Sequence, residues 1–138
     1  MEEIIEGLQE SLEAELYASM FLWTCLYNTT GIVPYELYNE FFKSGHKSEL
    51  KHFNLIAEQL QGYLTPVKYP NVNPPIFDTL EEMLEHLLEI EISAVERYTR
   101  LADVSSKLGN VAMNNFFADL AQEEEQDRKE VVKRVNHN

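Results

Sequence analysis

The stretch GHKSELKHF, residues 45–53, holds two residues whose types and spacing could bind a metal ion. Glu49 and His52 lie three positions apart, and residues with that spacing lie on the same face of a helix. A carboxylate and an imidazole on one face can be two solvated surface residues, or they can be half of a metal site. The metal-site interpretation requires that other parts of the chain bring further ligands to the same place.

The elements that would position these residues are long helices. Glycine and proline, which punctuate helices, are sparse and clustered in this sequence. Pro34 suits the first position of a helix, Thr79 and Glu82 have the spacing of a capping box, and Gly109 suits the position just after a helix, where Asn110 can cap the next one. The sequence predicts an all-α fold in one domain over residues 1–138, with helices over residues 2–28, 34–63, 79–108 and 110–135.

The connections between these helices predict their order in space. Two short connections, near residues 28–34 and 109–110, are typical of antiparallel neighbours. The middle connection, residues 64–77, contains four of the five prolines. Fully extended, this link spans at most about 45–50 Å, whereas a helix of about 28 residues, the size predicted on either side of it, is about 42 Å long. This link could run the full length of a bundle, as in four-helix bundles with one long crossover; a loose loop between antiparallel neighbours is the alternative.

Each predicted helix carries an acidic residue in the middle of its apolar face. On the first helix, for example, Leu8, Leu12, Glu15, Ser19 and Leu22 follow one another at intervals of three and four, the spacing of an inward-facing stripe. Buried carboxylates are costly unless they are paired or bind a metal. One such residue would be a solvated edge, but four at similar depth favour a metal site. The candidate ligands from the four stripes are Glu15, Glu49, His52, Glu91, Glu124 and Asp127.

This pattern resembles the ferritin-like di-iron carboxylate superfamily (ferritins, bacterioferritins and rubrerythrin-like proteins). Those proteins take a Glu from each of two helices and a Glu-x-x-His from each of the others. The matching segments here are EAELYAS, SELKH, LEIEISAVERY and AQEEEQD, and 34, 42 and 33 residues separate Glu15, Glu49, Glu91 and Glu124. The resemblance covers nearly the whole chain and implies a ferritin-like four-helix bundle with one long crossover between helices 2 and 3.

The resemblance also implies a metal content and a role for each ligand. It implies two iron ions per subunit, with manganese as the alternative, in which Glu49 bridges the metals. Glu15 and His52 would complete one metal site, and Glu91 and Glu124 the other. Asp127 stands where bacterioferritin- and rubrerythrin-like proteins have their second histidine, and Glu123 competes with it as a ligand. No haem is expected, because Leu50 stands where bacterioferritins use a methionine.

The function that follows from the resemblance is a ferroxidase, with Glu49 and His52 as its central residues. Such a protein binds Fe²⁺ and oxidises it with O₂ or H₂O₂, in iron storage and detoxification or in oxidative-stress defence. The alternatives are a rubrerythrin-like peroxidase or a di-metal oxygenase on the same bundle, or a metal-free bundle that mediates oligomerisation. We expect a homo-oligomer, either a dimer or a larger shell.

Composition limits the other partners. The net charge is −13, from 24 acidic and 11 basic residues, which disfavours nucleic acid and anionic membranes and suits either a self-repelling surface or a protein that handles cations. The longest apolar stretch is too short to cross a membrane. The single cysteine, Cys25, is expected to be a packing residue. We expect a cytoplasmic protein.

Four further polar residues receive plainer interpretations. Tyr98, two turns after Glu91, is expected to be a core tyrosine, and it could also hydrogen-bond to a metal ligand. His46, one turn before Glu49, could feed the site but is expected at the surface. His86 and His137 are expected to be exposed.

Overall fold

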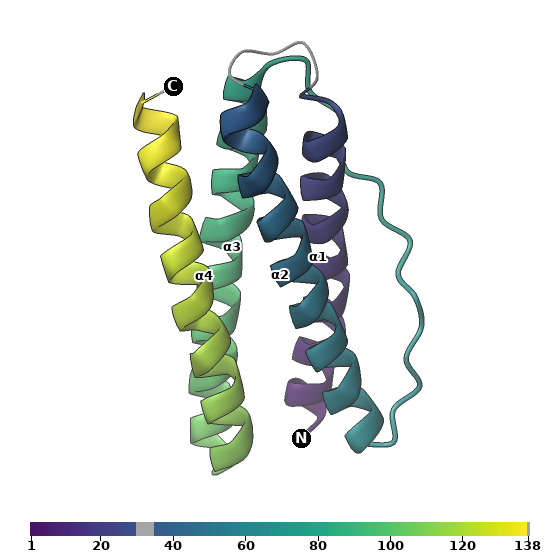
Figure 1. Ribbon diagram of the computed structural model, residues 1–138. Coiled ribbons are helices and arrows are strands. Elements are labelled where there is room, and N and C mark those ends of the chain that lie inside the picture. Colours follow the sequence, from purple (N-terminus) through teal and green to yellow (C-terminus); the bar gives the residue numbers. More distant parts are fainter. Residues whose placement is uncertain (30–34, 138) are drawn as a thin grey trace.

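The computed structural model describes residues 1–29 and 35–137, and it contains four helices (Figure 1). Within the described residues there is no strand, so the all-α prediction is confirmed. The expected helix start at Pro34 lies outside the described residues. The helices are α1 (Glu2–Tyr27), α2 (Tyr35–Gly62), α3 (Leu80–Lys107) and α4 (Val111–His137).

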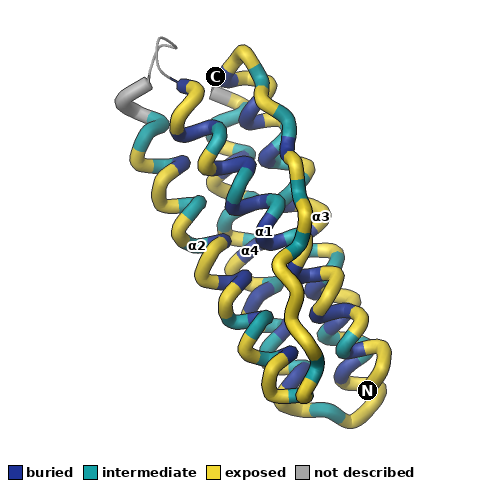
Figure 2. The backbone as a smooth tube through the Cα atoms, turned by 90° about the vertical axis from the view of Figure 1, so that its right-hand side faces the viewer, coloured by how far each residue is buried: buried dark blue, intermediate teal, exposed yellow. Residues whose placement is uncertain are grey.

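The proline-rich link runs along the outside of the bundle from the end of α2 to the start of α3 (Figure 1). As a result α2 and α3 run in the same direction, while α1 and α4 run opposite to them. Most of the link is exposed or half-buried (Figure 2), with Pro74 as its one buried residue. The long crossover predicted from the length of this segment is therefore confirmed.

Local signals in the sequence account for the ends of α3. The Oγ1 of Thr79 accepts a hydrogen bond from the Glu82 backbone N–H at 3.2 Å and donates one to the Glu82 carboxylate at 2.8 Å, which fixes the helix start. At the other end Gly109 adopts φ 73°. Its N–H donates to the carbonyl of Ser106 and that of Asn110 to the carbonyl of Ser105, the Schellman arrangement that left-handed glycine allows. Asn110 then caps α4 through its side-chain oxygen.

The four helices pack as two antiparallel pairs, α1 with α2 and α3 with α4, which meet mainly between α1 and α3. Their apolar faces form two separate core clusters. Along α3 one cluster ends at Leu87 and the other begins at Ala94, and along α2 Phe42 belongs to one and Phe53 to the other. The buried polar residues of the bundle lie in the layer between these two clusters. None of the described helices combines the length and the apolarity needed to cross a membrane.

Candidate metal centre

The layer between the two apolar clusters holds the six side chains that the sequence predicts as ligands. The two clusters exclude water from both ends, so five of the six are almost fully buried. Their exposed fractions are 1% for Glu15, 3% for Glu49, 1% for His52, 2% for Glu91 and 1% for Glu124. The sixth residue, Asp127, is half-buried. Helical spacing brings these residues to one depth, because each is separated from its apolar neighbours by three or four positions.

The six residues form two overlapping groups with metal-binding geometry. The His52 group consists of Glu15, Glu49, His52 and Glu124, and the Asp127 group consists of Glu49, Glu91, Glu124 and Asp127. In each group the ligand atoms lie within 4.8 Å of one another. Glu49 belongs to both groups, as a bridging ligand would. Glu124 also belongs to both, whereas the family resemblance implied it for the second metal only.

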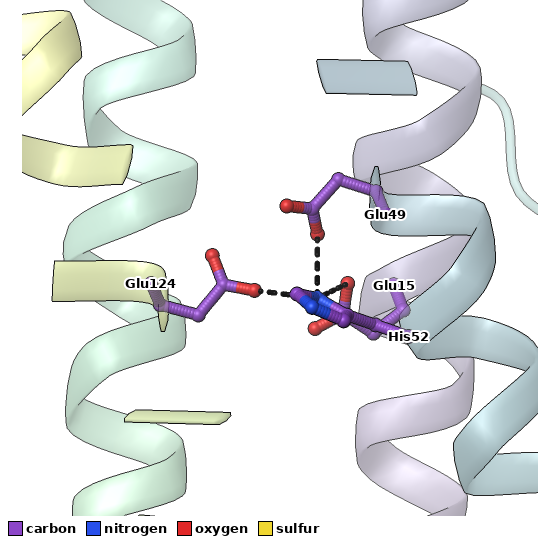
Figure 3. A group of neighbouring side chains, drawn as sticks. All are labelled: Glu15, Glu49, His52 and Glu124. Atoms are coloured by element: carbon purple, nitrogen blue, oxygen red, sulfur yellow. Dashed lines mark hydrogen bonds and ion pairs between the residues drawn. The ribbon is translucent and has the colours of Figure 1, made fainter. Parts of the chain in front are cut away.

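The imidazole of His52 lies at the centre of its group and is held from both sides. Figure 3 shows the carboxyl groups of Glu15, Glu49 and Glu124 directed at it. The Nδ1 atom donates to Glu124 Oε1 at 3.1 Å and lies 3.8 Å from Glu15 Oε2 and 3.9 Å from Glu49 Oε2. Nδ1 is therefore the ring nitrogen that would bind a cation in the cluster.

The other ring nitrogen of His52, Nε2, donates to the carboxylate of Glu123. The side chain of Glu123 is 60% exposed and lies on the outer side of the imidazole, away from the other acids. A carboxylate in this position fixes the ring orientation and raises its basicity, as outer partners of metal-bound histidines do. This geometry favours an orienting role for Glu123 over its role as a competing ligand.

Glu15 has two further partners on α3. The hydroxyl of Tyr98 donates to Glu15 Oε1, and the guanidinium of Arg97 lies 3.7 Å from the same oxygen. Tyr98 is fully buried, and Arg97 lies over its ring at 4.7 Å from the centroid. Tyr98 is thus both a core residue and a hydrogen-bond donor to a candidate ligand.

The crowded acids differ in their protonation. Burial and the neighbouring Glu15 charge raise the pKa of Glu49 well above its usual value, and burial with Glu124 does the same for Glu91. Burial raises the pKa of Asp127 to about 7. Burial opposes ionisation of Glu15 too, but the neighbouring Glu49 carboxyl and His52 imidazolium lower its pKa to about 2. Burial likewise opposes charge on His52, yet its hydrogen bond to Glu124 and the nearby Glu15 carboxylate raise its pKa to about 11.

Three carboxylate oxygens in the layer are buried and lack a hydrogen-bond partner among the described residues: Glu15 Oε2, Glu91 Oε2 and Glu124 Oε2. Such orphaned acceptors are costly unless a cation or water binds them. Carboxylate oxygens with one imidazole nitrogen are a donor set that suits divalent iron, manganese or zinc. The residues present therefore fit a site for two divalent metal ions.

Two pockets reach the cluster. The α1–α3 pocket, about 440 Å³, is lined by residues of α1, α3 and the crossover, and the buried Glu15 and Glu49 form part of its wall. The α2–α4 pocket, about 480 Å³, has Glu49, Glu91 and Asp127 in its wall and is lined by both polar and apolar residues, the apolar ones including Leu22, Leu87 and Val131. Each pocket thus gives access to a different group of the centre.

Two histidines lie in environments that the sequence did not indicate. The expectations that His46 is a surface residue and that His86 is exposed are wrong. His46 is half-buried and donates from Nδ1 to the Ser19 carbonyl at 2.8 Å. The side chain of His86 is 22% exposed; Nε2 pairs with the Tyr17 hydroxyl at 2.9 Å, and the ring packs against Phe21 and Phe77. The exposure of His137 falls outside what the structure describes.

Two other outcomes concern Cys25 and Arg97. Cys25 is buried, and burial raises the pKa of its thiol to about 12, in keeping with a packing role. Sequence reasoning did not single out Arg97. It lies three residues after Ala94 and four before Leu101 on α3, so the helical spacing alone would have placed it beside the stripe.

Residues 5–137 match the family model of the ferritin-like domain. The chain belongs to the ferritin-like family. Solved structures agree with this ferritin-like assignment. A ferritin-like di-iron carboxylate protein of Bacillus anthracis has a TM-score of 0.85 at 23% identity, over 97% of this chain and 96% of that one. Rhodobacter capsulatus bacterioferritin has a TM-score of 0.91 at 20% identity, over 99% and 85%. An open-pore ferritin of Archaeoglobus fulgidus has a TM-score of 0.87 at 19% identity, over 99% and 85%.

A curated relative is far longer than this ferritin-like chain. A probable serine/threonine-protein kinase of Dictyostelium discoideum is 30% identical over 76 residues, which is 55% of this chain and 8% of that protein. The chain therefore spans less than a tenth of the length of this relative.

Proposed function

We propose that this chain is a ferroxidase, which binds two Fe²⁺ ions in the buried layer and oxidises them to Fe³⁺ with O₂ or H₂O₂. The observation that carries this proposal is the pair of overlapping ligand groups, which share Glu49 and Glu124. Orphaned buried oxygens in both groups support it, because they leave acceptors free for cations. Neighbours that include a di-iron carboxylate protein and a bacterioferritin with a dinuclear site support it further.

In this proposal each metal ion takes one group. One Fe²⁺ binds Glu15 and His52 Nδ1, the other binds Glu91 and Asp127, and Glu49 bridges them. Glu124 lies within reach of both ions. Two metals held by shared carboxylates in other proteins lie about 3.5–4 Å apart, which suits two groups that have common members. Manganese fits the same donor set, and iron is the substrate we propose.

The residues of the chain supply charge and proton sites, and the iron supplies the redox chemistry. Five carboxylates favour Fe³⁺ over Fe²⁺ because the higher charge gains more from them. Loading requires His52 to lose the proton on Nδ1 and Glu49 and Glu91 to ionise, since a metal ion binds only the deprotonated groups. The apolar clusters cover the ions from both ends of the bundle, and the two pockets give access to them from the side.

The pocket geometry favours one rival function. The α2–α4 pocket brings an apolar patch (Leu22, Leu87 and Val131) next to Glu91 and Asp127, an arrangement that an oxygenase could use for an organic substrate. A di-metal oxygenase is therefore the rival that the pocket favours, and a rubrerythrin-like peroxidase is the other alternative on the same bundle. We place either function in the cytoplasm and in a homo-oligomer, in iron storage and detoxification or in oxidative-stress defence.

The decisive experiment adds Fe²⁺ aerobically to the metal-free protein. Ferric absorbance is followed against iron added per chain, and the mass of the assembly is measured by size exclusion. Rapid oxidation that continues to hundreds of irons per assembly supports storage. Saturation at two irons per chain in a dimer would exclude iron storage and favour the oxygenase or the peroxidase. Oxidation no faster than in buffer, for wild type and His52→Ala alike, leaves only the metal-free structural bundle.

A further inference from the structure

A buried cation lies next to the acidic centre, where it would oppose metal binding. The Arg97 side chain is 9% exposed, and its nearest terminal nitrogen lies 3.7 Å from Glu15 Oε1. This distance is too long for a hydrogen bond. Glu15 already accepts from Tyr98 and lies beside the His52 ring, so it has other partners. The position of Arg97 therefore calls for a role beyond neutralising Glu15.

The guanidinium of Arg97 has donor capacity that the protein does not use. Its Nε is buried and has no hydrogen-bond partner among the described residues. Stacking over the Tyr98 ring holds the guanidinium plane in place. A buried donor without an acceptor is costly, and it shows that the described residues do not use the full donor set of this guanidinium.

Arg97 lines the α1–α3 pocket together with Ser93, and Glu15 and Glu49 lie on the same pocket wall. A molecule in this pocket can therefore contact Arg97 and an iron ion of the His52 group at once. Three exposed carboxylates, Glu10, Glu13 and Glu89, also line the pocket, and of these Glu10 pairs with Arg100. This acidic lining repels anions and admits cations and neutral molecules.

We infer that Arg97 forms a subsite for hydrogen peroxide and selects it over dioxygen as the electron acceptor; this inference rests on the proposed ferroxidase function. H₂O₂ is neutral and passes the acidic lining, and its oxygens accept hydrogen bonds from the guanidinium. O₂ is a poor acceptor and gains little from the same donor. As the O–O bond breaks, negative charge develops on the oxygens, and a fixed guanidinium stabilises that charge most in the transition state.

The proposed reaction balances without a further reductant. Each of two Fe²⁺ ions gives one electron, the O–O bond of H₂O₂ breaks, and two protons from solvent complete two water molecules. The products are two Fe³⁺ and two H₂O. Arg97 keeps its own proton throughout, since its guanidinium remains charged. Its contribution is confined to binding and to charge stabilisation.

The test compares initial rates of Fe²⁺ oxidation with H₂O₂ in the absence of air and with O₂ at equal concentration. The wild type is expected to be faster with H₂O₂. Arg97→Met is expected to slow the H₂O₂ reaction about 100-fold, the size seen when one such donor is lost, and to leave the O₂ rate within about twofold. Arg97→Lys keeps the charge and should recover part of the H₂O₂ rate. The control is Arg100→Met, one turn away on the same helix and 54% exposed, which should keep the wild-type ratio.

A second measurement separates this role from a folding defect. Calorimetric titration with Mn²⁺ in the absence of air should give two ions per chain for both wild type and Arg97→Met. An equal loss of the H₂O₂ and O₂ rates, an unchanged ratio, or a wild type that prefers O₂ would each overturn the inference. If the wild type oxidises Fe²⁺ with neither oxidant, the ferroxidase proposal itself fails. If the wild type uses both oxidants and Arg97→Met keeps the wild-type ratio of the H₂O₂ rate to the O₂ rate, the ferroxidase proposal stands and the peroxide subsite is rejected.

Discussion

The two halves of the centre share Glu49 and Glu124 but differ in what surrounds them. In the His52 group, Glu15 accepts from Tyr98 and the imidazole is held by carboxylates on both ring nitrogens. In the Asp127 group all four members are acids, and burial and neighbouring charge raise the pKa of Glu91 and Asp127. One half is therefore organised by hydrogen bonds before any metal arrives, whereas the two acids found only in the other half, Glu91 and Asp127, have raised pKa values.

This difference assigns different behaviour to the two halves. A pre-organised group with a nitrogen ligand binds its metal more tightly, because little rearrangement is needed on loading. Both groups have to release protons on loading, one from His52 Nδ1 and the other from Glu91 and Asp127, so both affinities depend on pH. In a ferroxidase, the His52 group would hold iron firmly and the Asp127 group would exchange it.

The largest effect is expected from removing what the two halves share. Glu49→Ala deletes an oxygen that belongs to both groups. Since loss of an outer partner alone costs 10–100-fold, we expect a loss of more than about 100-fold in the initial rate of Fe²⁺ oxidation. Stopped-flow absorbance measures it, with Glu58→Ala, an exposed acid on the same helix, as the control. Two tightly bound metals in Glu49→Ala would refute the shared role.

Substitutions confined to one half should then separate the groups. His52→Ala removes the one nitrogen from the proposed ligand set and should leave one Mn²⁺ per chain in calorimetry. Asp127→Ala removes one of four acids from its group, so we expect it to be milder, with about tenfold weaker binding of the second ion only. Equal losses in the two variants would show that the second metal is wrongly assigned.

The protons in the Asp127 group predict how the stability of the metal-free protein depends on pH. The pKa of Asp127 rises from 3.8 to about 7, and those of Glu49 and Glu91 rise as well. A group whose pKa is raised in the folded state stabilises the fold at pH values below its unfolded-state pKa. That stabilisation is lost as the pH rises through its folded-state pKa. The thermal unfolding midpoint of the metal-free protein should therefore decrease as the pH is raised from 5 to 8.

His52 acts in the same direction, because its pKa is raised to about 11 in the folded state. Its contribution to stability therefore also declines as the pH rises above the usual pKa of histidine. Glu15, with a pKa of about 2, acts in the opposite sense but only below about pH 4.5. Scanning calorimetry in chelator measures the slope. Asp127→Asn should flatten it, whereas the exposed control Asp119→Asn should not. A midpoint that rises from pH 5 to pH 8 would contradict this account.

The smallest effect is expected at the outer edge of the His52 group. Glu123→Gln leaves every proposed ligand in place but weakens the hold on His52 Nε2. Because Glu123 is largely exposed, we expect the low end of the usual range, about tenfold weaker binding of the first metal. Calorimetry would show this as a change in one of two affinities. A change in the second affinity alone would contradict the assignment of Glu123 to the His52 group.

Helical spacing was enough to predict the four-helix bundle and the buried position of the acids. The stripes are regular, so Glu15, Glu91 and Glu124 stand out as polar residues at core positions. The length and proline content of the link pointed to the crossover. These features depend on residues close together in the sequence or on periodicity, which a single sequence displays.

The contacts between helices could not be predicted in the same way. Glu123 and His52 are 71 positions apart and Tyr98 and Glu15 are 83 apart, so their pairing depends on how the helices are rotated against one another. That rotation also brings Glu124 into both groups and turns His86 inward against Tyr17. Arg97 was missed because a charged residue at the edge of a stripe usually extends to solvent.

The central claim, two iron ions held in two groups that share Glu49, is tested most directly by a crystal structure after loading with Fe²⁺ in the absence of air. Anomalous scattering at the iron edge locates each ion without reference to activity. The account predicts two peaks about 3.5–4 Å apart, one at Glu15 and His52 Nδ1 and one at Glu91 and Asp127, with Glu49 between them. A single peak, or iron bound only to surface carboxylates, would contradict it.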